Sequence, residues 1–307
     1  MKVSYLPQAN IDKQKWDRCI NTAPNGLIYA YSFYLDAMSK NWDALILNDY
    51  EIVMPLTWNK KYGVYYLYQP FFTKTLGIFG NISDEIVNLF LHAIPKHFKY
   101  LDIDFKEYII DPNKLTLKNL QLKRRDNFLL DLNKKYEQIY GEYKRLALRM
   151  LKKAAAHNVE VLRNRNVTEV IEFYQKYYSK KHPGIKFNDY KRLTAACNIA
   201  SGKTQAATYV AEINGQVVAV YLVLKDEKFI YSLIGGSNKN GKDCGAFYLL
   251  TDAAIKDHAG TNRTFRFEGS DKKGIAFFNM QFNPVPINYY HLTLNKLPWP
   301  IKFFKKN

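Results

Sequence analysis

The sequence of 307 residues is poor in cysteine, with three in all: Cys19, Cys197 and Cys244. Their number is odd and no two are close in the sequence, which argues against a disulfide framework. The first residues lack the apolar core of a secretory signal, and no run of about 18 apolar residues could span a bilayer. We therefore expect a protein of the reducing cytoplasm with no integral membrane segment.

The motifs of three common kinds of active site are also missing. The six histidines form no His-x-x-x-His pair and no Cys-x-x-Cys pair occurs, so no metal site is expected. The Gly-x-Ser-x-Gly turn that carries the nucleophile of many hydrolases is absent. The segment Ser201-Gly202-Lys203-Thr204 has the end of a phosphate-binding loop, but Cys197 stands where that loop needs its first glycine.

Negative charge is scarce, because 45 Lys and Arg face 28 Asp and Glu, for a net charge of +17. Most of the excess lies in residues 134–165, 176–192 and 296–307. This clustering favours an anion-binding face, although a merely basic soluble surface is the alternative. The candidate contacts for a phosphate or another anion are Arg149, Lys152, Lys153, Lys180 and Lys181.

Strand and helix patterns alternate along the whole chain, which predicts a mixed α/β fold. Residues 136–151 have apolar side chains at three- and four-residue spacing, so we expect one helix that ends near His157. Asn214-Gly215 stands between two strand-like segments, which predicts a hairpin turn. No low-complexity linker interrupts the chain.

A glycine-rich segment follows the strand predicted to end at Ile234 and precedes a helix predicted over residues 246–258. Backbone N–H groups at such a helix start can bind a phosphate or a carboxylate. A flexible surface loop with glycines for its turns is an equally good interpretation. The candidate cofactor-binding residues of this segment are Gly235, Gly236, Ser237, Asn238, Gly241 and Gly245.

The order of these elements with Phe267-Glu268-Gly269-Ser270 and the Gly274–Phe282 run resembles the acyltransferase core of the GNAT superfamily. The resemblance is closer to the Fem-like branch, whose members transfer acyl or aminoacyl groups to amines. The basic segment 143–160 and several segments of the first half, such as YQPFFTKTLGIFG, also look like Fem-like proteins. The resemblance implies two GNAT-like halves, residues 1–132 and 133–307, each a mixed, mostly antiparallel sheet flanked by helices.

The same resemblance implies a function and its partners. The donor would be an acyl-CoA thioester or an aminoacyl-tRNA, and the acceptor an amine on a small molecule or a cell-envelope precursor. Fem-type aminoacyltransferases tend to carry a lysine where this chain has Asn279. That departure favours the alternative, a non-catalytic GNAT-fold protein that binds RNA or an anionic envelope precursor.

Several polar residues are candidates for the chemistry, each with a structural alternative. Glu268 could take a proton from the attacking ammonium, or it could pair with Arg266 or Lys272. Tyr231 could offer its phenol to the leaving group, or simply pack. Ser270 could hold a phosphate or cap the next helix, and Gln69 could contact substrate or belong to a turn.

Overall fold

The computed structural model describes residues 2–105, 111–268, 272–297 and 299. The chain forms two compact units: unit 1 comprises residues 1–125 and 288–307, and unit 2 comprises residues 126–287. The boundary thus differs from the expected division at residue 132 in one main respect. The last strand of the chain belongs to the first unit, because it pairs there with a strand of that unit.

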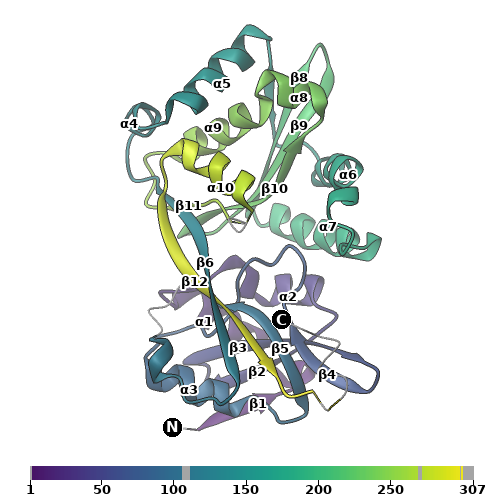
Figure 1. Ribbon diagram of the computed structural model, residues 1–307, viewed down its shortest axis with the longest axis vertical. Helices are drawn as coiled ribbons and strands as arrows, with labels where there is room; N and C mark the ends of the chain where they lie inside the picture. Colours follow the sequence, from purple (N-terminus) through teal and green to yellow (C-terminus); the bar gives the residue numbers. More distant parts are fainter. Residues whose placement is uncertain (1, 106–110, 269–271, 298, 300–307) are drawn as a thin grey trace. The chain divides into compact units, whose positions relative to one another are not determined.

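Unit 1 is a mostly antiparallel sheet with the strand order β1-β2-β3-β4-β5-β12, followed by the first half of β6 (Figure 1). Strands β4 and β5 form a parallel pair, and helix α3 connects these two strands. The strands are β1 (Val3–Leu6), β2 (Asn41–Leu47), β3 (Ile52–Lys61), β4 (Val64–Tyr68), β5 (Phe98–Phe105), β6 (Leu120–Asp131) and β12 (Val285–Asn295). The α-helices are α1 (Lys13–Thr22), α2 (Ser32–Met38) and α3 (Asp84–Ala93).

Both faces of β2 and of the first part of β3 are buried, which explains the largely apolar sequence of these strands. In β2, Leu45 and Leu47 belong to the core that α3 completes, whereas Trp42 points to the other face. There it packs against Trp16 of α1, with the ring centroids 5.1 Å apart. Helix α3 begins where Ser83 accepts a hydrogen bond from the Ile86 N–H, as expected for an N-cap.

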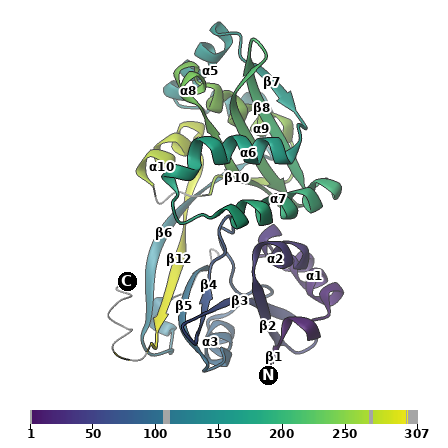
Figure 2. The same ribbon diagram turned by 90° about the vertical axis from the view of Figure 1, so that its right-hand side faces the viewer.

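Unit 2 has the strand order β6-β11-β10-β9-β8-β7, where β10 and β11 are parallel and α9 connects them. Helices α5 and α9 lie on one face of this sheet, and α6 and α7 lie on the other (Figures 1 and 2). The strands are β7 (Glu160–Arg163), β8 (Ala206–Ile213), β9 (Gln216–Lys225), β10 (Phe229–Ser237) and β11 (Thr264–Arg266). The α-helices are α4 (Tyr136–Gly141), α5 (Arg145–Ala156), α6 (Val167–Tyr178), α7 (Phe187–Gly202), α8 (Lys239–Cys244), α9 (Ala246–His258) and α10 (Lys273–Asn279).

The two units repeat one motif, in which antiparallel strands are followed by a parallel strand–helix–strand crossover. They also exchange strands: β6 follows β5 in sequence but pairs with β11, and β12 follows β11 but pairs with β5. This architecture confirms the predicted mixed α/β fold class, with mostly antiparallel strands flanked by helices in each unit, although all the strands belong to one 12-stranded sheet. The predicted hairpin turn is also confirmed, since Asn214 and Gly215 both have the positive φ that it requires.

Two predicted elements differ from the structure. The single helix expected over residues 136–158 is two helices, α4 and α5, because the Lys144 N–H donates to the carbonyl of Gln281 and residue 144 is extended. The loop expected to begin at Gly235 is the end of strand β10, which continues through Ser237 while pairing with β9. A sequence rich in glycine lowered its apparent strand propensity.

Candidate functional site

The parallel strands β10 and β11 of unit 2 part soon after they meet. They pair from Phe229 to Tyr231, opposite Thr264 to Arg266, and β11 ends there while β10 runs on to Ser237. A register shift between Ser232 and Ile234 marks a bulge in β10 opposite β9. Bulges re-aim backbone groups, and a strand edge without a partner strand offers N–H and C=O groups to a ligand.

Backbone groups along this edge point alternately toward β9 and away from it. The Ser237 groups point away from β9, because its N–H donates to the Tyr178 hydroxyl at 3.0 Å, and that hydroxyl donates to the Ser237 carbonyl at 3.2 Å. The N–H of Gly235, two residues earlier, therefore points to the same edge. Tyr178 is held in place by stacking on Tyr174, with ring centroids 5.0 Å apart.

All four glycines of the predicted cofactor loop, Gly235 included, are closely packed against the protein itself. A Cβ on Gly235 or Gly236 would lie 2.4 Å from the Phe247 ring or 2.3 Å from the Tyr178 ring. At Gly241 it would lie 2.2 Å from the carbonyl oxygen of Val218. Gly245 has a φ of +80° and packs against Met150. Each glycine thus has a packing reason for its presence, whether or not a ligand approaches it.

Some backbone donors of this segment are already satisfied. The Asn238 side chain caps α8 by accepting from the Gly241 N–H at 2.9 Å, and the Asn238 N–H donates to Val218 at 3.0 Å. The Gly245 N–H donates to the carbonyl of Lys242. Among the predicted loop residues, Gly235 therefore fits the role of a donor to an anion better than Asn238, Gly241 or Gly245.

Basic side chains gather beside Tyr178, and we call Lys181, His182, Lys242 and Lys272 the basic cluster. The Lys181 ammonium lies 4.6 Å from the centre of the Tyr178 ring. Its pKa is lowered by partial burial and by the positive charge of Lys242. The ring of His182 lies 3.4 Å from the Lys272 ammonium. An anion bound here would relieve the repulsion between Lys181 and Lys242. Lys180 is exposed next to the cluster.

Glu268 forms a buried ion pair, which was the alternative to a catalytic role. One carboxylate oxygen accepts from Arg266 Nε at 2.9 Å and the other from Asn127 Nδ2 at 3.1 Å. The Arg266 and Glu268 side chains are 1% and 3% exposed. The Glu268 backbone has a φ of +53°, and its N–H donates to Asn127 Oδ1. Sequence reasoning did not identify Asn127, which is distant in the chain.

Tyr231 is fully buried, and its phenol points to the opposite end of β10 from Ser237. Its hydroxyl donates to Asp226 at 2.5 Å, in the turn between β9 and β10. Burial raises the pKa of the Asp226 carboxyl. Asn279 is buried at the end of α10, and its side-chain nitrogen has no hydrogen-bond partner among the described residues. Ser270 lies outside the described residues.

The predicted anion contacts of the long basic segment share one exposed face of α5. Arg149, Lys152 and Lys153 are exposed, as is Arg145 one turn earlier, and their spacing places all four on one side of the helix. The opposite side carries the buried residues Ala147, Leu151 and Ala154. We call the four exposed cations the α5 basic face.

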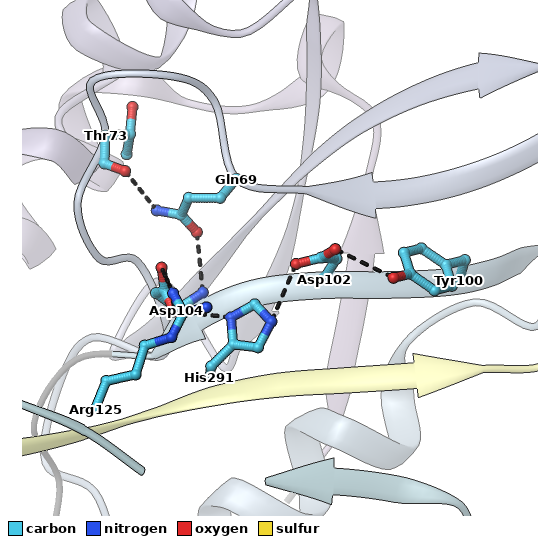
Figure 3. Close-up of polar contacts among 7 residues, drawn as sticks. All are labelled: Gln69, Thr73, Tyr100, Asp102, Asp104, Arg125 and His291. Atoms are coloured by element: carbon cyan, nitrogen blue, oxygen red, sulfur yellow. Dashed lines mark hydrogen bonds and ion pairs between the residues drawn. The ribbon is translucent and has the colours of Figure 1, made fainter. Parts of the chain in front are cut away.

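Gln69 lies in a polar network of unit 1 that the sequence did not reveal (Figure 3). Its side-chain oxygen accepts from the Asp104 N–H at 3.2 Å, and its nitrogen donates to the carbonyl of Thr73 at 3.1 Å. The Asp104 carboxylate accepts from Arg125 at 2.8 Å and from Nδ1 of His291 at 2.8 Å. Gln69 thus fixes the backbone from which Asp104 projects.

His291 is held between two carboxylates, since its Nε2 also lies 3.2 Å from Asp102 Oδ1. The hydrogen bonds to Asp102 and Asp104 raise the pKa of His291 to about 9. Both ring nitrogens therefore act as donors at neutral pH. The one signal in the sequence is the alternation of Tyr100, Asp102 and Asp104 along β5, which places them on one face.

We expect this network to make stability depend on pH. The pKa of His291 is raised from about 6.5 in the unfolded chain to about 9. Its contribution is therefore complete below about pH 6.5 and is lost as the pH rises through about 9. We expect a loss on the order of 2 kcal/mol, reduced from the full shift because Asp102 is partly exposed. Urea unfolding at several pH values measures it, and His291→Gln should flatten the curve. Equal curves for both proteins would contradict the assignment.

Comparisons with known proteins show the fold. No family model and no curated protein matches the sequence. The structure of FemX matches with a TM-score of 0.66 at 12% identity, over 94% of this chain and 97% of FemX. A tandem GNAT protein from the clavulanic acid biosynthesis pathway matches with a TM-score of 0.59 at 10% identity, over 97% and 99% of the two chains. L-PGS from Bacillus licheniformis matches with a TM-score of 0.53 at 14% identity, over 86% and 87%.

These likenesses confirm the predicted fold, since the chain shares its fold with FemX and with the tandem GNAT protein. Among the described residues, no helix combines the length and the hydropathy needed to cross a membrane.

Proposed function

We propose that the protein is an N-acyltransferase that moves an acyl or aminoacyl group to an amine. The observation that carries this proposal is the parting of β10 and β11, with the Gly235 N–H on an edge of β10 that no described strand covers and the basic cluster beside it. When an amine attacks an ester or thioester carbonyl, negative charge develops on the carbonyl oxygen, and a positioned N–H stabilises it. The basic cluster is suited to phosphate groups of the donor.

An aminoacyl-tRNA fits the described residues better than acyl-CoA as the donor. Tyr178 already occupies the edge of β10 at Ser237, which shortens the open edge available to an extended CoA arm. The α5 basic face adds four exposed cations to the basic cluster of the same unit. A polynucleotide offers a row of phosphates to such a surface, whereas CoA offers few.

The proposed donor can be tested by binding and transfer. We expect tRNA to bind with an affinity that falls by roughly 10³-fold or more between about 50 and 200 mM salt, because bound phosphates release counterions. Replacing the four cations of the α5 basic face by glutamine should weaken binding and flatten the salt dependence. Glutamine at the exposed Lys60, Lys61, Lys96 and Lys99 of unit 1 is the matched control.

Transfer is then followed in single turnover, with labelled aminoacyl-tRNA or acetyl-CoA and an excess of amine. Appearance of the labelled amide supports the enzyme. Binding of tRNA that is indifferent to salt excludes the tRNA donor. Specific tRNA binding with no transfer from either donor favours the second candidate, a non-catalytic binding protein. The observation that favours this candidate is the engagement of both Glu268 oxygens by Arg266 and Asn127.

A further inference from the structure

Unit 1 contains a pocket of about 350 Å³ on the polar face of strands β5, β12 and β6. The opposite face of these strands belongs to the hydrophobic core, with Ile103 and Leu292 among its buried residues. The volume falls at the lower end of the range for small-molecule sites, about 300–1,000 Å³. The pocket is lined by Tyr100, Asp102, Gln121, Leu122, Lys123, Arg125, His291 and Thr293.

One side of the pocket is acidic. The Asp102 side chain is 42% exposed, although it accepts from the Tyr100 hydroxyl at 3.1 Å and from His291 (Figure 3). Burial and the neighbouring carboxylate raise the pKa of Tyr100 to about 12, so its phenol keeps its proton and fixes Asp102. Asp102 thus presents a positioned carboxylate on the β5 side.

The β6 side of the pocket is basic. Lys123 and Arg125 are two residues apart in this strand, so both side chains lie on the same face of it, and both line the pocket. The strand order β5-β12-β6 separates β6 from β5 by two strand spacings, about 10 Å. Between them, His291 contacts both Asp102 and Asp104, and Arg125 contacts Asp104. In these contacts the two carboxylates, Asp102 and Asp104, face two cations, His291 and Arg125. Lys123 then adds a cation on the side opposite Asp102.

We infer that this pocket binds a small zwitterion, a free amino acid or a short peptide, with its ammonium at Asp102 and its carboxylate at Lys123 and Arg125. Asp102 and Lys123 lie on opposite sides of this pocket, so a ligand that carries both a positive and a negative charge can contact both of them. A ligand with only a negative charge would be repelled by the Asp102 carboxylate, and a ligand with only a positive charge would be repelled by the Lys123 ammonium. Metal binding is disfavoured, because both ring nitrogens of His291 act as donors to carboxylates.

The ligand class also suits the acceptor of the proposed reaction, and this step rests on the proposed function. Binding itself does not, because it is measured without any acyl donor. If the protein does not transfer an acyl group, the zwitterion should still bind in the pocket. If the zwitterion does not bind, the transfer assay with other amines is unaffected.

The test is calorimetric titration of the full chain with L-lysine, L-alanine and glycylglycine. Propylamine, propionate and inorganic phosphate are the probes with one kind of charge. We expect at least one zwitterion to bind at least about tenfold more tightly than every single-charge probe, which is the effect of one added charge-assisted contact. The three zwitterions distinguish a free amino acid from a short peptide.

Variants locate the two ends of the ligand. Asp102→Asn and Lys123→Gln should each weaken zwitterion binding by about tenfold. Arg124→Gln is the matched control, because Arg124 adjoins Lys123 but contacts Asn288 and should leave binding unchanged. Thermal melting checks that each variant folds, and Lys123→Gln carries the test by itself where Asp102→Asn does not fold.

Three outcomes would overturn the inference. The first is phosphate or propionate binding as tightly as the best zwitterion. The second is zwitterion binding that is unchanged by Lys123→Gln. The third is the absence of zwitterion binding at about 10 mM, where even a weak specific site would be detected.

Discussion

Replacing Arg266 by methionine is expected to lower the free energy of unfolding by about 3–5 kcal/mol. The substitution leaves the Glu268 carboxylate buried in unit 2 without its cation, since the two side chains are 1% and 3% exposed. Glu268→Gln leaves the opposite charge, that of Arg266, buried and should cost a similar amount. Urea unfolding measures both effects.

An exposed ion pair of the same unit gives the matched control. Arg163 bonds Asp257 at 2.7 Å, but their side chains are 43% and 29% exposed. Arg163→Met should therefore cost less than about 1 kcal/mol. The double variant Arg266→Met with Glu268→Leu should recover much of the loss, because a buried ion pair can often be replaced by apolar residues. If Arg266→Met and Arg163→Met lowered the free energy of unfolding by the same amount, burial would not explain the effect at Arg266.

The Glu268→Gln variant also decides between the two interpretations of Glu268. A general base contributes about 10²–10⁴-fold to the rate. If Glu268 has a structural role, the variant should be less stable while single-turnover transfer remains nearly intact below its melting temperature. A rate loss of the catalytic size, with unchanged stability, would instead establish Glu268 as the base of the proposed reaction.

Gly241→Val is the second substitution with a large expected effect, a loss of about 3 kcal/mol or more. A Cβ at Gly241 would lie 2.2 Å from the carbonyl oxygen of Val218, and a backbone atom of β9 cannot move aside as a flexible side chain can. Valine adds two methyl groups to that clash. The melting temperature and urea midpoint measure the loss.

Gly274→Val in α10 is the control for this substitution, because a Cβ there would meet no atom within 4 Å. It should change stability by less than about 1 kcal/mol, the size of a helix-propensity effect. A Gly241→Val protein as stable as the Gly274→Val protein, but unable to bind the donor, would restore Gly241 as a ligand-contact residue. Equal losses of stability and binding would identify it as a packing residue.

Features that depend only on neighbouring residues, such as a hairpin turn or one face of a helix, could be predicted from the sequence. The Asn214-Gly215 turn needs two residues that tolerate positive φ, and an Asn-Gly pair can be identified directly in the sequence. The cations of the α5 basic face share one side of a helix because of their spacing alone. The break between α4 and α5 could not be predicted in this way, since the acceptor of the Lys144 N–H lies far along the chain at Gln281.

The polar sites depend on contacts between distant residues, and for that reason they escaped prediction. Asn127 reaches Glu268 across 141 residues, and His291 reaches Asp104 across 187. Nothing near Glu268 in the sequence distinguishes a catalytic carboxylate from one paired with Arg266, because both would end a strand. The order of the elements predicted the fold, and the side-chain partners required the structure.

The place of β12 has a consequence for how the protein is made. Strand β5 is synthesised early, but its antiparallel partner β12 leaves the ribosome only after all of unit 2. The two strands are about 180 residues apart, so at roughly 5–20 residues per second the delay is roughly 10–40 s. During that time the nascent β5 has an unpaired edge, and such edges recruit other chains. We expect the yield of folded protein in a cell to depend on shielding of this edge during translation.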